Sequence, residues 1–345
     1  MSSEMASNAI LAKARAMYGK CLSDNDYRQL MDCRNVSEVA SYLKSRTNYR
    51  SVLAGLNENE VHRGQLEPIL RQNLYYDISS LSRYARDKSL VFSNFIISEM
   101  EIEQIIRCLT LLNIGRADEF VFGLPMAMTK FARIDLKAFS TVRSFDDLLD
   151  VLASSHYAAA LRKHRPKDGE RADISIIEAE LNNQNYAMVM EAFDKQKSTR
   201  DRDELKDTFS AMLDFRNISR IIRLKRYFNY SAEKIMPLLI PYGKLSKRTV
   251  EELCSASDAR EVFELARSTY LGRLMSKLKY NDQSMMANAL LSMYCKHHLR
   301  LSANPTIVMI SYVYLKQIEI ANIVNIIEST RYGLSPDEKS AMLVR

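Results

Sequence analysis

The stretch LDFRNISRII, residues 213–222, returns 105 positions later as IEIANIVNII, residues 318–327, and a related stretch, MEIEQIIRCL, covers residues 100–109. Isoleucines recur in these stretches at helical spacing. Around the two later stretches, the matched pairs are Asp214 and Glu319, Asn217 and Asn322, Ile218 and Ile323, Ile222 and Ile327, Arg226 and Arg331, and Tyr227 and Tyr332. So many matches at one offset indicate an internal repeat with a period of about 110 residues. The sequence therefore predicts three related long helices.

A second repeated element precedes the long helices. It reads LSDNDYRQLMDCRNVSEVASYLKSRTNY over residues 22–49, LSKRTVEELCSASDAREVFELARSTY over residues 245–270 and, for its later half, SFDDLLDVLASSHY over residues 144–157. Ser23 is a predicted N-cap because Asp26 follows three residues later, as in a capping box. Ser257 precedes its own helical stretch in the same way. These segments are therefore expected to be groups of short helices.

Each repeat is predicted to hold a pair of long helices after its short ones. The expected pairs are residues 58–87 and 92–112, 174–196 and 201–227, and 282–301 and 305–332. Gly333 is expected to end the last helix, with Pro336 just beyond. Breaks at Gly123–Pro125 and Asn229–Ser231 divide the chain into three helical repeats, residues 1–122, 123–229 and 230–345. Because one repeat cannot bury its helical faces alone, the three are expected to form a single domain around a pseudo-threefold axis.

The composition favours a folded, mostly helical protein. Of the 345 residues, 47% are hydrophobic and 26% charged, and Gly and Pro are scarce, at 9 and 7. The net charge is +7, but the basic residues are interleaved with acidic ones, which favours a solvated helix face or an acidic protein partner over nucleic acid. Five cysteines without a CxxC pair indicate a reducing compartment. The most apolar run begins at Pro305, and Lys316 and Glu319 interrupt it, so no stretch is expected to span a bilayer.

The sequence contains no signature of catalysis. It has no GxxxxGK[ST] phosphate loop, no GxGxxG, no HExxH and no GxSxG. We therefore expect no catalytic residue, no cofactor and no metal ligand. Asp146, Asp147 and Asp150 form a DDxxD string, which holds Mg²⁺ and a diphosphate in all-α isoprenoid synthases. No second acidic motif follows, so an acidic first turn favoured by the helix dipole is the preferred interpretation.

A basic helix is predicted within ISRIIRLKRYFNY, residues 218–230. It carries arginines together with aromatic residues, a combination that can stack nucleic-acid bases. Its isoleucines also recur at helical spacing, as in an amphipathic helix whose arginine stems cover apolar surface. The amphipathic interpretation needs fewer assumptions, and we expect no nucleic-acid partner.

Two stretches carry a resemblance to a known family. LSDNDYRQLMDC…VSEVASYLKSRTNYRSVL, within residues 22–53, resembles the first repeat of the C-type central-stalk component of the A/V-type rotary ATPases, the counterpart of the d-type component in the eukaryotic enzyme. YLKQIEIANIVNIIESTRYG, residues 314–333, is similar to the last helix of that family. The resemblance covers essentially the whole chain. The family commonly places a basic residue before the Asn of the last helix; here Ala321 stands there, while Arg216 keeps the pattern in the second repeat.

The resemblance implies a funnel of helices on the cytoplasmic side of a membrane, peripheral and without an active site of its own. Shaft subunits of the D and F type would insert into its mouth, and it would carry torque to the membrane rotor ring, touching the membrane only through the ring. The residues expected to line the socket are Gln104, Arg107, Arg216, Asn217, Arg220, Glu319 and Asn322. Alternatively, these side chains tie helices together within the funnel. The alternative function is a stand-alone helical scaffold for protein partners.

Overall fold

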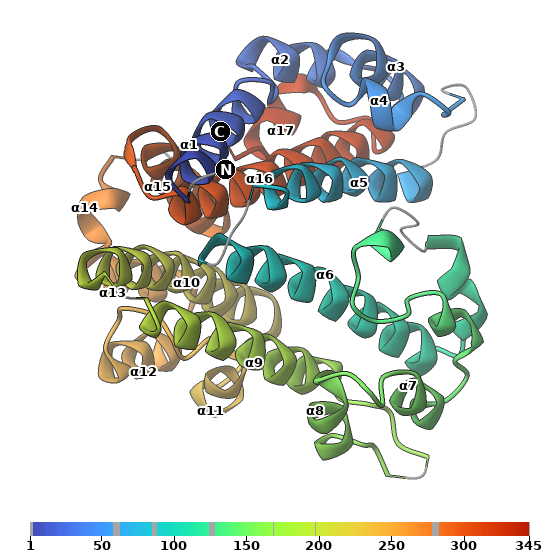
Figure 1. Ribbon diagram of the computed structural model, residues 1–345, viewed down its shortest axis with the longest axis vertical. Helices are drawn as coiled ribbons and strands as arrows, with labels where there is room; N and C mark the ends of the chain where they lie inside the picture. The colour runs from blue at the N-terminus through green and yellow to red at the C-terminus, as the bar shows by residue number, and fades with distance from the viewer. Residues whose placement is uncertain are drawn as a thin grey trace. The chain divides into compact units, whose positions relative to one another are not determined.

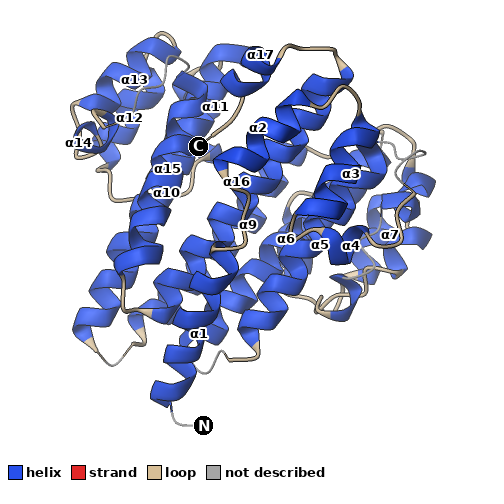
Figure 2. Cartoon of the chain, turned by 90° about the horizontal axis from the view of Figure 1, so that it is seen from above, coloured by secondary structure: helices blue, strands red, loops and turns tan. Residues whose placement is uncertain are grey.

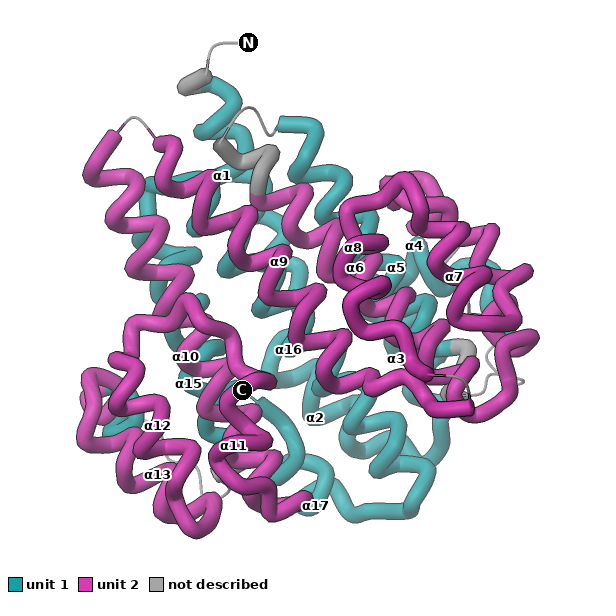
Figure 3. The backbone as a smooth tube through the Cα atoms, turned by 90° about the horizontal axis from the view of Figure 1, so that it is seen from below, with its two compact units in different colours: residues 1–89, 274–345 teal, residues 90–273 magenta. Residues whose placement is uncertain are grey.

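The computed structural model describes residues 3–57, 63–84, 88–123, 128–167, 169–196, 198–277 and 283–344. Throughout these ranges the chain is all-α, with helices joined by loops and no strand (Figure 2). This confirms the predicted all-α class. The chain divides into two compact units, residues 1–89 with 274–345, and residues 90–273 (Figure 3).

The first unit is built around one long helix, α16. Its helices are α1 (Ser3–Tyr18), α2 (Asp24–Asp32), α3 (Val36–Arg46), α4 (Arg50–Leu53), α5 (Arg63–Ser82), α15 (Gln283–Leu301), α16 (Pro305–Arg331) and α17 (Pro336–Ala341). Helix α16 packs against α1, α5 and α15, which lie beside it in Figure 1. Every residue of α16 from Thr306 to Lys316 is buried. Segments from the two ends of the chain therefore share one core.

Helix α16 is also long and apolar enough, by length and composition, to cross a membrane. Its most apolar 18-residue window has a mean hydropathy of 1.4, yet 78% of that window is buried inside the protein. Core helices of globular proteins have this same composition, since they are covered on every side. We therefore interpret α16 as the core helix of its unit.

The second unit carries the other long helices and the remaining short ones. Its elements are α6 (Lys88–Asn113), η1 (Ala117–Gly123), η2 (Met128–Lys130), η3 (Ala138–Thr141), α7 (Phe145–Val151), α8 (Tyr157–Lys163), α9 (Ile174–Asp194), α10 (Thr199–Phe228), α11 (Ala232–Ile235), η4 (Met236–Leu238), α12 (Lys247–Ser255), α13 (Ala259–Arg267) and α14 (Gly272–Met275). The boundary between the units falls inside α6 and α14. Helix α10 packs against α9, α12 and α13.

The long helices lie where the sequence predicted them, as α5, α6, α9, α10, α15 and α16. The predicted ends at residues 58, 87 and 282, and Pro125 at the first repeat boundary, lie outside the described residues. Ser23 caps α2 in a capping box with Asp26, as predicted. The prediction for Ser257 was wrong by one residue. Asp258 caps α13, and Ser257 instead donates to the carboxylate of Glu261.

Helices α6, α10 and α16 each end next to a left-handed residue. These are Gly115 (φ 71°), Asn229 (φ 47°) and Gly333 (φ 69°). At Gly333 the backbone closes as in a Schellman motif, because the N–H of Leu334 donates to the carbonyl of Ser329 at 2.9 Å. Gly333 therefore ends α16 as predicted, and Pro336 just beyond it begins a further short helix, α17.

Candidate functional site

A buried carboxylate on each of α6, α10 and α16 accepts a hydrogen bond from a tyrosine hydroxyl. The pairs are Glu101 with Tyr157 at 2.7 Å, Asp214 with Tyr270 at 2.8 Å, and Glu319 with Tyr49 at 2.8 Å. The carboxylates are the acidic positions of the three repeated helix stretches, and the tyrosines end the three repeated short-helix segments. We call each pair a clasp. The clasps fasten the short-helix groups to the long helices.

Each clasp also holds the backbone near the start of a short-helix group. The carboxylate of Glu101 accepts from the N–H of Arg133. Asp214 accepts from the N–H groups of Lys244 and Leu245, at 2.8 and 3.1 Å, and Glu319 accepts from that of Leu22 at 2.6 Å. Backbone donors buried without an acceptor are costly, so each carboxylate satisfies groups that otherwise would have none. One side chain thus fixes both ends of a short-helix group.

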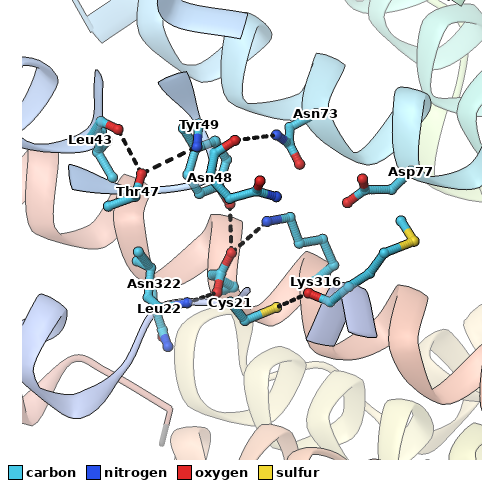
Figure 4. A network of polar contacts seen from close by, with 12 residues as sticks. Cys21, Leu22, Leu43, Thr47, Asn48, Tyr49, Asn73, Asp77, Lys316 and Asn322 are labelled. Atoms are coloured by element: carbon cyan, nitrogen blue, oxygen red, sulfur yellow. Dashed lines mark hydrogen bonds and ion pairs between the residues drawn. The ribbon is translucent and has the colours of Figure 1, made fainter. Parts of the chain in front are cut away.

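The Glu319 clasp contains a buried ion pair (Figure 4). The ammonium of Lys316, whose side chain is 1% exposed, lies 2.6 Å from the carboxylate of Glu319 and 4.2 Å from the centre of the Tyr49 ring. Burial alone would lower the pKa of Lys316, but the carboxylate of Glu319 raises it above its ordinary value. Lys316 therefore stays charged inside the unit and neutralises Glu319.

The other two clasps also have a cation nearby, but it comes from a different part of the chain than the carboxylate. Arg133 lies 3.2 Å from the carboxylate of Glu101. Lys244 lies 5.2 Å from the centre of the Tyr270 ring and forms an ion pair with Asp207. In neither case does the cation come from the long helix itself. The ion pair within one helix is thus a feature of the Glu319 clasp.

The predicted residues Asn217 and Asn322 each hold one backbone position with both polar atoms of the amide. Asn217 donates to the carbonyl of Ile240 and accepts from its N–H, both at 2.9 Å. Asn322 does the same with Val344, at 2.6 and 2.9 Å. Gln104 is buried at the matching position of α6, and its Oε1 has no partner among the described residues. The asparagines therefore tie the segment after each long helix back onto that helix.

The predicted arginines are partly exposed and make similar ties. Arg107 donates to the carbonyl of Phe120 at 3.2 Å, and Arg220 donates to that of Leu238. Arg216 forms an ion pair with Glu99 at 2.8 Å. Three residues after Asn322, Asn325 donates to Met342 in the same manner, at 3.1 Å. The intramolecular contacts agree with the alternative that these residues join helices, and any contact with a partner stays a prediction.

The sequence did not predict the clasps as such. Glu319 was a candidate, but Glu101, Asp214 and the tyrosines were not, and Lys316 was noted only as an interruption of an apolar run. The signal was present, because the acidic positions and the tyrosines both recur in the repeats. These recurring positions indicate which types of residue pair, but not which repeats are in contact.

The DDxxD string, considered for metal binding, and the basic helix, considered for nucleic-acid binding, both have structural roles. Asp147 completes the capping box of α7 with Ser144, and Asp146 forms an ion pair with Arg165 at 2.6 Å. Asp146 and Asp147 lie in the first turn of α7, as predicted, whereas Asp150 lies near the end of that helix. On α10, Ile218, Ile221 and Ile222 are buried, which confirms the amphipathic interpretation of the basic helix.

Buried tyrosines make the stability of the protein sensitive to alkali. Burial raises the pKa of Tyr49 and Tyr157, and the clasp carboxylates raise it further. Burial raises the pKa of Tyr186 to about 12, although Arg216 opposes the shift. Below pH ~10 both folded and unfolded chains keep the phenolic proton. Above it only the unfolded chain loses the proton, so stability is lost as pH rises.

We expect the free energy of unfolding to fall above pH ~10, by up to about 1.4 kcal/mol per pH unit for each such tyrosine. Urea denaturation followed by circular dichroism between pH 8 and 11 measures this fall. Tyr186→Phe should make it shallower because one titrating group is removed. A midpoint that stays constant up to pH 11 contradicts the prediction.

The described residues thus form helices joined by loops, in which buried polar contacts of one kind fasten short-helix groups to long helices at three places. A family model described as ATP synthase (C/AC39) subunit matches residues 10–342, and the chain belongs to this family.

Individual relatives share moderate identity with the chain, and each is named as the C subunit of an A-type ATP synthase. The relative from Pyrococcus horikoshii is 26% identical over 72% of this chain, and the match covers 64% of that protein, just under two thirds. The relative from Pyrococcus abyssi is 20% identical over 96% of this chain and 88% of its own length. The relative from Methanosarcina mazei is 23% identical over 75% of this chain and 69% of its own length.

Proposed function

We propose that this chain is the non-catalytic, C-type central-stalk component of an A-type or V-type rotary ATPase. The observation that carries the proposal is the family match over residues 10–342, together with relatives named as the C subunit of A-type ATP synthases. In this role the chain seats the rotor shaft subunits, of the D and F type, on the membrane rotor ring. It sits on the cytoplasmic side of the membrane and reaches the membrane only through the ring. The torque that it transmits couples ATP hydrolysis or synthesis to H⁺ or Na⁺ transport.

The clasps support a mechanical role. A part that transmits torque must not let its helices slide past one another, and close-packed interiors resist such deformation. Apolar packing has no direction of its own. Hydrogen bonds do have one, and they fix the register of each short-helix group on its long helix. The Glu101, Asp214 and Glu319 clasps place such directional contacts at repeated positions.

The repeated contacts also support the finer architecture that we propose. Three pseudo-symmetric repeats, residues 1–122, 123–229 and 230–345, would together form the walls of a funnel. The clasp carboxylate, the amide three residues later and the left-handed helix end recur on α6, α10 and α16 in the same order. Among the candidate contacts, the partly exposed Arg107, Arg216 and Arg220 are better placed to reach a shaft subunit than the buried Asn217 and Asn322.

The test is affinity purification of the tagged full-length chain from detergent-solubilised membranes of its own cell, with the co-purifying chains identified by mass spectrometry. Recovery of ATPase head, shaft and ring subunits in stoichiometric amounts supports the proposal. Recovery only from the soluble fraction, without these subunits, overturns it. That outcome would favour the stand-alone helical scaffold.

A charge-reversal variant tests the proposed contacts. Arg216→Glu with Arg220→Glu is expected to reduce co-purification of shaft subunits at least about tenfold, because the reversal would place like charges against each other at an interface that these arginines complement. The matched control is Lys247→Glu with Arg248→Glu on α12, where both side chains are highly exposed, at 84% and 88%. The control should keep its partners. Equal recovery from both variants, with helical content unchanged, would show that Arg216 and Arg220 contact no shaft subunit.

A further inference from the structure

The first unit contains a cavity of about 340 Å³ beside the Glu319 clasp. Its lining includes Tyr18 of α1, Asp24 of α2, and Ser292, Lys296 and Arg300 of α15. Helix α16 contributes Glu319 and Asn322. The volume lies at the lower end of the range of small-molecule sites, roughly 300–1,000 Å³. The cavity is therefore large enough for a small ligand.

The α15 wall carries two positive charges, Lys296 and Arg300, which the single carboxylate of Asp24 offsets only in part. Ser292, Lys296 and Arg300 are spaced four residues apart, so they follow one face of the helix. Like charges at this spacing destabilise a helix, and neither Lys296 nor Arg300 forms an ion pair within 4.0 Å in the part of the chain that the structure describes. Burial lowers the pKa of Lys296; Asp24 opposes that shift and Arg300 adds to it. An anion between the two cations would relieve their repulsion.

The other residues that line the cavity do not cancel the remaining positive charge. The charge of Glu319 is already neutralised by Lys316, and its carboxylate accepts hydrogen bonds from the Tyr49 hydroxyl and the Leu22 N–H. Asp24 is the other acidic residue of the lining. Asp24 is also the first residue of α2, so the amino end of that helix, with its partial positive charge, adjoins the cavity. The hydroxyls of Tyr18 and Ser292 provide further hydrogen-bond donors.

We propose that this cavity binds a phosphate group, carried by inorganic phosphate or by a small phosphorylated molecule. Arg300 has the planar fork of donors that matches phosphate oxygens, and Lys296 contributes a point charge beside it. The cavity has more room than a single phosphate ion fills, and Leu315 and Ile318 add apolar lining for the rest of a ligand. The inference concerns the isolated chain and does not depend on the proposed function.

Isothermal titration calorimetry of the full-length chain tests the proposal, with inorganic phosphate, AMP and adenosine as probes at constant ionic strength. We expect saturable binding of phosphate or AMP, or both, and none of adenosine. Binding of phosphate alone identifies the free ion as the ligand, and tighter binding of AMP identifies a phosphorylated molecule. No saturable binding of either overturns the proposal.

Variants locate the site. Lys296→Met with Arg300→Met should weaken binding at least tenfold, whereas Lys247→Met with Arg248→Met, which removes the same charges from the exposed surface of α12, should leave it unchanged. If both variants bind equally weakly, or if both bind as tightly as the unmodified chain, the assignment to this cavity is overturned. Hydrogen–deuterium exchange on the unmodified chain needs no variant. Whichever of phosphate and AMP binds in the calorimetry should slow exchange in residues 18–26 and 292–300, and unchanged exchange there counts against the proposal.

Discussion

Glu319→Leu is expected to lower the free energy of unfolding by about 3–5 kcal/mol, because it leaves a buried cation without its counter-ion. Lys316 is 1% exposed and has Glu319 as its ion-pair partner. The substitution also removes the acceptor of the Tyr49 hydroxyl and of the Leu22 N–H. Urea denaturation of the purified chain, followed by circular dichroism, measures the loss. Glu191→Leu on α9, where the carboxylate side chain is 67% exposed, is the control for the change of residue type.

The double variant Lys316→Met with Glu319→Leu distinguishes a lost ion pair from lost packing. A buried pair replaced by apolar residues of similar size is often neutral for stability. We therefore expect the double variant to recover a large part of the stability lost in Glu319→Leu. A double-mutant cycle gives the coupling between the two sites. Additive effects of the two substitutions would show that the pair contributes no coupling.

Gly243→Ala is expected to destabilise the protein by about 1–3 kcal/mol, as overpacking does in a close-packed site. A Cβ atom at this position would lie 1.9 Å from Oδ1 of Asp214, so one of the two must move. Asp214 has little freedom to move, because Lys244, Leu245 and Tyr270 all hold its other oxygen. The shift of the urea midpoint relative to the unmodified chain measures the effect.

Gly55→Ala is the matched control, since a Cβ atom there meets nothing within 4 Å. It should change stability by only a few tenths of a kcal/mol. Asp214→Ala removes the obstructing side chain. In that background, Gly243→Ala should lower the free energy of unfolding by less than it does in the unmodified chain. Equal costs in the two backgrounds would exclude the clash as the cause.

The long helices could be predicted from sequence because their signals are local. Apolar residues at helical spacing, few glycines and a left-handed residue at Gly333 all act within one helix. The sequence does not distinguish Ser257 from Asp258 as the N-cap, because both side chains can accept the capping hydrogen bond. The structure uses Asp258, and Ser257 binds the side chain of Glu261 instead.

The clasps were harder to predict because their partners are distant in sequence. Tyr49 and Glu319 are 270 residues apart, and a repeat pattern says which positions are equivalent but not which repeats touch. Lys316 interrupts an apolar run, which marks it as unusual, yet the partner that allows its burial lies three residues further along the same helix. Spacing of oppositely charged residues within an apolar helix would have indicated that pair.

The discontinuity of the first unit has a consequence for biosynthesis. Its helices α1 to α5 leave the ribosome early, but the residue that anchors Leu22 and Tyr49 is on α16, near the far end of the chain. The second unit is continuous over residues 90–273 and can be completed while synthesis is still under way. Domains generally fold as units, starting with those synthesised first. Here we expect helices α1 to α5 to remain unprotected until α16 has been synthesised, and pulse proteolysis of stalled nascent chains of increasing length should detect this.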